Sequence, residues 1–71
     1  MTPADMKDFR ARHGLTQAKL ARLVGYRAAT APQNIIRYEG GRTSIPEPVA
    51  TIMRAIDRSP SARLVFEGMA T

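Results

Sequence analysis

Apolar residues recur along this chain at helical spacing, in short runs separated by glycine, proline and threonine. The clearest run places its apolar residues at i, i+3, i+4 and i+7, as Val49, Ile52, Met53 and Ile56. Shorter stripes of the same kind come before and after it. The pattern predicts an all-α protein, a compact bundle of five helices with no strand, in which no helix exceeds about 12 residues.

Cap and stop residues divide the first half of the chain into helices. Thr2 is an expected N-cap, and the helix after it runs to about His13, before Gly14. Thr16 is expected to cap a second helix, which ends at Gly25. The apolar residues that should hold these two helices are Met6, Phe9, Leu15, Leu20, Leu23 and Val24.

Similar signals bound the remaining three helices. Thr30, Pro32 and Gln33 predict a third helix with a capping box, which runs to about Glu39 and turns Ile35 and Tyr38 inward. A glycine pair follows it. Two prolines, Pro46 and Pro48, fit the first turn of a fourth helix, and Ser59-Pro60 begins a last, shorter helix that ends at Gly68.

Length and composition narrow the class of protein. The 71 residues are expected to form a single domain over 1–71, with 60–71 as a candidate dimerisation tail. The absence of Cys excludes disulfides and thiolate metal sites. No apolar stretch approaches the roughly 18 residues that span a bilayer, and residues 1–5 lack the basic and apolar regions of a signal peptide. We therefore expect a cytoplasmic protein with no membrane partner.

The positive charge is concentrated in the first part of the chain. The net charge is +5, and residues 1–42 carry all of it, since they hold eight Lys and Arg against three acids. Residues 43–71 hold three of each kind and are neutral. This distribution favours a polyanionic partner for the basic part and leaves the neutral part free to pack or self-associate.

The sequence shows no recognisable set of catalytic residues. The serines Ser44, Ser59 and Ser61 have no base near them in the sequence, because the single histidine is the distant His13. Paired carboxylates, metal-ligand clusters and glycine-rich phosphate loops are missing. We expect no enzymatic activity, no cofactor, no metal and no small-molecule ligand.

Two short helices broken at Gly25 are the informative part of the chain, because the second is rich in polar side chains. The segment Gly-Leu-Thr-Gln-Ala-Lys-Leu-Ala at 14–21 resembles the first half of the helix-turn-helix of the phage Cro/repressor (XRE-like) family. Ile-Ile-Arg-Tyr-Glu-Gly-Gly-Arg at 35–42 resembles the second half, and Ile-Pro-Glu-Pro-Val-Ala at 45–50 resembles the start of the following helix. The resemblance covers 5–57 and implies a λ-repressor-like bundle that binds double-stranded DNA.

The resemblance also implies roles for individual residues. Gln17 would contact a phosphate from the start of the second helix. Gln33 and Arg37 would read bases in the major groove, and Arg42 would meet the backbone. A structural ion pair would join Arg10 to Glu39.

The turn between the two helices departs from the family pattern. It is about four residues longer, at 26–30. Arg27 becomes a candidate backbone or minor-groove contact, and Thr30 a candidate phosphate contact. Asn34 would either read adenine or hold a phosphate, and Gln33 would either read a base or only complete a capping box with Thr30. Ile36 lies off the anchored face and is expected to pack under the long turn rather than touch a thymine methyl.

Two functions remain open from the sequence. The first is a dimeric transcriptional regulator, an autorepressor on an inverted-repeat operator, comparable in size to small phage regulators such as those linked to anti-CRISPR genes. The alternative is an antitoxin or adaptor whose main partner is another protein. A set of apolar residues in the last helix either caps the core or forms a homodimer contact: Leu64, Val65, Phe66 and Met69.

Overall fold

The protein is all-α, as the sequence predicts. The computed structural model describes residues 1–70, apart from the side chains of Pro60, Met69 and Ala70, so the expected contact through Met69 lies outside the described residues. Five helices follow one another along the chain: α1 (Pro3–Arg12), α2 (Gln17–Leu23), α3 (Ala31–Glu39), α4 (Glu47–Arg58) and α5 (Pro60–Ala70). No helix within the described range is long and apolar enough to cross a bilayer.

One core holds the first four helices together. Its largest fully buried side chains come from α1 (Met6 and Phe9), α2 (Leu20), α3 (Ile35) and α4 (Met53 and Ile56). The fifth helix adds Phe66, which is half-buried against this core. Each of the first four helices therefore buries the apolar stripe that its sequence spacing predicts.

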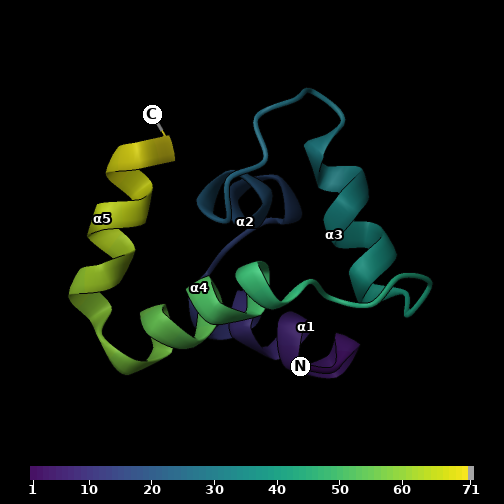
Figure 1. Cartoon of the computed structure of the whole chain (residues 1–71), viewed down its shortest axis with the longest axis horizontal. Coiled ribbons are helices and arrows are strands. Elements are labelled where there is room, and N and C mark those ends of the chain that lie inside the picture. The colour runs from purple at the N-terminus through teal and green to yellow at the C-terminus, as the bar shows by residue number, and fades with distance from the viewer. Residues whose placement is uncertain (71) are drawn as a thin grey trace.

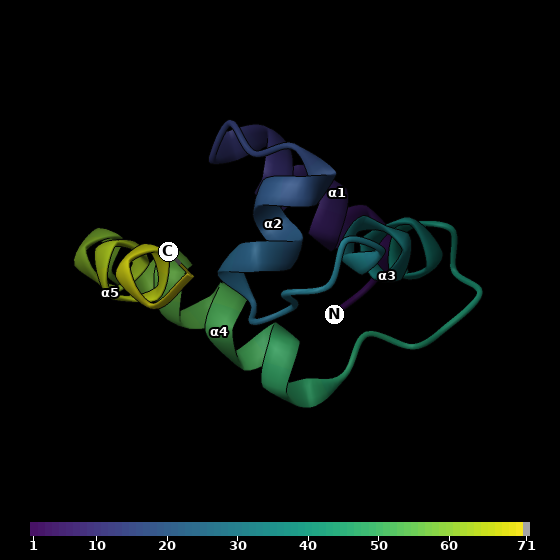
Figure 2. The ribbon, with the colours of Figure 1, turned by 90° about the horizontal axis from the view of Figure 1, so that it is seen from above.

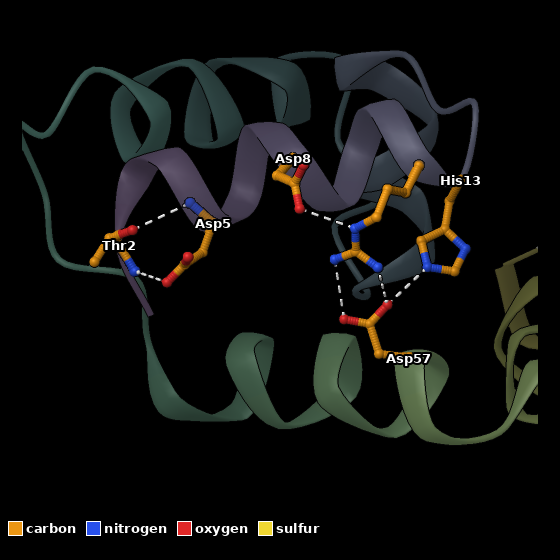
Figure 3. Close-up of polar contacts among 6 residues, drawn as sticks. Thr2, Asp5, Asp8, His13 and Asp57 are labelled. Carbon is orange, nitrogen blue, oxygen red and sulfur yellow. Dashed lines mark hydrogen bonds and ion pairs between the residues drawn. The ribbon is translucent and has the colours of Figure 1, made fainter.

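The first two helices begin and end where the caps predict. Thr2 Oγ1 accepts the N–H of Asp5, and the Asp5 carboxylate accepts the N–H of Thr2 at 2.9 Å, which completes a capping box (Figure 3). These bonds hold the pKa of Asp5 below its usual range. Thr16 Oγ1 likewise accepts the N–H of Lys19. After each helix a glycine takes a positive φ, +63° at Gly14 and +102° at Gly25, which other residues rarely adopt.

Three expected features of the helix ends are wrong, although Thr30 is the N-cap of α3 as predicted. Thr30 precedes α3 but makes no side-chain cap, because its ψ is 5° rather than extended and the Gln33 N–H is already bonded to the Thr30 carbonyl. Pro46 is the N-cap of α4, so only Pro48 lies in the first turn. Gly68 does not end α5, which continues to Ala70. A glycine raises the cost of a helix without removing any backbone hydrogen bond.

The third and fifth helices lie at opposite ends of the molecule. Both views place α3 at one end of the long axis and α5 at the other, with α2 and α4 between them (Figures 1 and 2). The molecule measures 31 × 25 × 21 Å. The outer surface of α3 is therefore far from that of α5.

Polar contacts join α1 to α4 and α5. The Asp57 carboxylate on α4 accepts two bonds from Arg12, at 2.8 and 3.2 Å, and lies 2.9 Å from His13 Nε2 (Figure 3). Arg12 and His13 keep the pKa of Asp57 below its ordinary value. Arg63 on α5 donates to the carbonyl of His13 at 3.0 Å. These contacts hold the C-terminal helices against the end of α1.

Candidate nucleic-acid interface

The third helix is fixed to the body by one face and open to solvent on the other. Ile35 is fully buried and Tyr38 is 6% exposed, as expected for the anchored face. Gln33, Ile36 and Arg37 are exposed. Ile36 does not pack under the turn as expected, since 46% of its surface is exposed. The exposed face of α3 thus combines amide, guanidinium and aliphatic groups.

Two of the expected base-reading residues are bonded to each other. Arg37 Nη2 donates to Asn34 Oδ1 at 2.6 Å, across one turn of α3. Asn34 is half-buried, so this bond orients the longer Arg37 side chain along the surface of the helix. Gln33 makes no capping box with Thr30, and its amide is free of that role.

A buried carboxylate fixes the relative positions of α1, α2 and α3. Glu39 is 6% exposed, and its oxygens accept from Arg10 Nε at 2.9 Å and Arg10 Nη2 at 3.2 Å. The expected ion pair is therefore present. Gln17 Nε2 donates to the same carboxylate at 3.2 Å, a bond between residues 22 positions apart that no local sequence pattern indicates. The Gln17 amide has a second N–H, which the bond to Glu39 does not use.

The long turn at 26–30 is tied to both helices of the pair. The Tyr26 backbone N–H donates to the carbonyl of Ala21 on α2, and its hydroxyl lies 2.7 Å from that of Tyr38 on α3. Burial and the bond to Tyr38 raise the pKa of Tyr26 to about 12. Tyr26 is not among the residues expected from the sequence, where its only signal is a large aromatic residue directly after Gly25.

The remaining expected phosphate contacts lie on the surface around α3. Arg27 and Thr30 are exposed in the turn before the helix. Arg42 is exposed in the loop after it, where its backbone N–H donates to the carbonyl of Arg37 at 3.2 Å. Gly41 permits this bend with a φ of +76°. Candidate contacts therefore lie near both ends of α3.

The acidic residues are neutralised mainly away from this surface. Five of the six form ion pairs with arginines, and the sixth, Asp5, bonds to the N-cap of α1. Four of those five lie on α1, α4 or α5, and the fifth is Glu39 at the buried end of α3. Within the described part of the chain, no ion pair involves Lys19, Arg22, Arg37 or Arg42. The uncompensated charge on α2, α3 and the following loop accordingly faces solvent.

The expected contacts on α5 differ in exposure. Leu64 is 69% and Val65 61% exposed, so neither caps the core. Phe66 packs against the core instead. The exposed apolar pair belongs to α5, the helix at the end of the molecule opposite α3 (Figure 1).

Among the described residues, no group of His, Asp and Glu side chains has the geometry of a metal site. Comparison of the chain with models of protein families, with curated proteins and with solved structures finds no match. The function is therefore argued from the geometry of α2, α3 and the segments that join them.

Proposed function

We propose that this protein is a sequence-specific DNA-binding regulator of transcription that places α3 in the major groove. The observation that carries the proposal is the set of exposed cations without acidic partners on α2, on α3 and after it: Lys19, Arg22, Arg37 and Arg42. A duplex would supply the missing counter-charge. The groove admits one α-helix, and α3 is held by Ile35 and Tyr38 so that its polar face is outward.

The bond between Arg37 and Asn34 favours a particular kind of base edge. Adenine is read by an Asn side chain that uses both its oxygen and its nitrogen. Here the Asn34 oxygen already accepts from Arg37. The pair then offers N–H donors, which complement the two acceptors N7 and O6 of guanine. Guanine is the base we expect opposite Arg37.

The exposed pair on α5 supports a dimer. Leu64 and Val65 lie on a helix at the far end from α3, so a second copy could cover them without blocking the groove-facing surface. A twofold dimer would place two α3 helices on an inverted-repeat site, about 34 Å apart. Such a protein, in the cytoplasm, would repress its own promoter by occupying it.

The same exposed pair supports a second candidate function. An antitoxin or adaptor would use Leu64 and Val65 to bind a different protein. The oligomeric state separates the two, because a regulator of the first kind is a dimer by itself. The second function would be favoured if the wild-type protein is a monomer, binds DNA weakly and binds a co-expressed partner protein tightly.

The decisive experiment measures DNA binding by an α3 variant. Wild-type protein is used to select duplexes from random DNA, and the dissociation constant is then measured for Arg37→Ala. A good Arg–guanine contact contributes about 1–3 kcal/mol, so affinity should fall by about 5- to 150-fold. The control is Arg58→Ala, which removes an exposed cation at the last residue of α4, directly before α5. Failure of the wild type to bind any duplex at low ionic strength, or equal binding by Arg37→Ala, would refute the proposal.

A further inference from the structure

A hollow of about 250 Å³ lies between α2 and the long turn before α3, and no acidic side chain lines it. We refer to it as the turn pocket. Three of its residues are cations from two elements, and the rest are small. The lining residues are Ala18, Lys19, Arg22, Arg27, Ala28, Ala29, Ala31 and Pro32.

Two cations of the turn pocket come from α2, and no acidic side chain lines the wall beside them. Lys19 and Arg22 are three residues apart on α2 and therefore share a face of that helix. Both are exposed, and within the described residues neither side chain forms a hydrogen bond or an ion pair. Like charges held this close repel one another unless an anion lies between them. The alanines leave room for that anion to approach.

The turn that brings Arg27 to the pocket is fastened at both ends. Tyr26 bonds to Ala21 through its N–H and to Tyr38 through its hydroxyl. Ala31 N–H bonds to the carbonyl of Ala28 at 2.9 Å. Fixing the turn in advance lowers the entropy lost when a ligand is bound. Arg27 is thus held beside α2 before any ligand arrives.

The start of α3 does not itself bind an anion in this arrangement. The Ala31 and Gln33 N–H groups are already bonded to turn carbonyls, and Pro32 has no N–H. The anion would have to be held by side-chain cations from α2 and the turn. Arg27 and two of the alanines in the pocket wall come from the long turn at 26–30, so the pocket depends on that turn.

We propose that the turn pocket binds one phosphate of the DNA backbone, beside the groove that α3 enters. This inference rests on the proposed function. Ala31 and Pro32, in the first turn of α3, form part of the pocket wall. A strand whose bases meet α3 would therefore carry a phosphate past Lys19, Arg22 and Arg27.

The test is the salt dependence of binding to a duplex selected from random DNA by the wild type. Each phosphate contact contributes about 0.9 to the slope of log affinity against log salt concentration. Arg22→Gln should lower the slope by about that amount and leave the selected sequence unchanged. Between 50 and 200 mM salt, the variant should then lose about 3.5-fold less affinity than the wild type. Arg58→Gln, at the last residue of α4, should keep the wild-type slope.

The outcomes separate this inference from the function on which it rests. A wild type that binds DNA, with unchanged slopes for both Arg22→Gln and Lys19→Gln, would overturn the phosphate site alone. A wild type that binds no duplex would overturn both. Titration with inorganic phosphate in the absence of DNA distinguishes the source of the anion. The titration is followed by NMR. Chemical-shift changes of the Arg22 and Arg27 side chains that saturate at submillimolar phosphate would overturn the assignment to DNA in favour of a free anion.

Discussion

The hydroxyl of Tyr26 lies 2.7 Å from the hydroxyl of Tyr38, and this bond joins the long turn to the buried face of α3. The two residues come from different segments, one half-buried in the turn and the other in the core. Because α3 carries the candidate base-reading residues, the bond couples the shape of the turn to the position of the helix. The turn therefore belongs to the candidate interface rather than being a loose connection.

Removal of either hydroxyl should weaken the fold by a similar amount. We expect Tyr26→Phe and Tyr38→Phe each to lower the free energy of unfolding by about 0.5–1.5 kcal/mol, the usual contribution of one hydrogen bond. The double variant should be little worse than either, because both changes break the same bond. Urea denaturation of the three variants measures this. Fully additive losses would show that the two hydroxyls do not act as a pair.

The same bond predicts a loss of stability at alkaline pH. The pKa of Tyr26 is raised to about 12 in the folded protein, chiefly by burial, against 10.0 for a free tyrosine. Because the pKa of Tyr26 is higher in the folded than in the unfolded protein, its neutral phenol makes its full contribution to the free energy of unfolding below about pH 10. That contribution is lost as the pH rises towards 12. Thermal melts from pH 9 to 12 should show a steeper decline for the wild type than for Tyr26→Phe. Parallel curves would contradict the shift.

Loss of Arg10, the ion-pair partner of Glu39, should lower the free energy of unfolding more than any other single change near the candidate interface. The Glu39 side chain is 5% exposed and accepts two bonds from Arg10. Arg10→Ala leaves that carboxylate buried and unpaired, at an expected cost of about 3 kcal/mol. Gln17→Ala removes one weaker bond and should cost about 1 kcal/mol. Denaturation at neutral pH compares the two. Equal small losses would show that the carboxylate is solvated.

Base preference should follow the Arg37–Asn34 pair. Wild-type selections from random DNA should contain guanine at the position opposite Arg37. Arg37→Lys replaces the planar guanidinium, which can donate two parallel hydrogen bonds, with a single ammonium. The change should weaken the preference for guanine by about tenfold or less. Asn34→Ala should leave guanine preferred but lower affinity, because Arg37 loses its orienting partner. Selection of adenine there by the wild type would contradict the donor-only argument while leaving DNA binding intact.

Self-association should depend on the exposed pair of α5. Leu64→Asp places a charge where 69% of the side chain is exposed in the single chain, so the monomer should fold as before. Sedimentation equilibrium should show a dimer for the wild type and a monomer for the variant. Ser61→Asp, an exposed change on the same helix, is the matched control. A wild type that is monomeric at all concentrations would direct attention to a partner protein instead.

Helix positions could be predicted from the sequence because their signals are local. The cap and stop residues affect the backbone only three or four positions away: Thr2, Thr16, Gly14 and Gly25. The apolar stripe on α4 likewise repeats within one helix. The local signal failed at Thr30, where the ψ angle is set by the turn. It also failed at Gly68, where α5 continues.

The chemistry of the candidate interface depended on contacts that no local pattern contains. Gln17 meets Glu39 across 22 positions, and Tyr26 meets Tyr38 across 12. Arg12 and Asp57 are 45 positions apart. The helices, the buried faces of the first four and the excess of positive charge follow from the order of residues along the chain. Which cations keep an acidic partner, and which apolar residues stay uncovered, follow from the fold, because both depend on packing distances between helices remote in the chain.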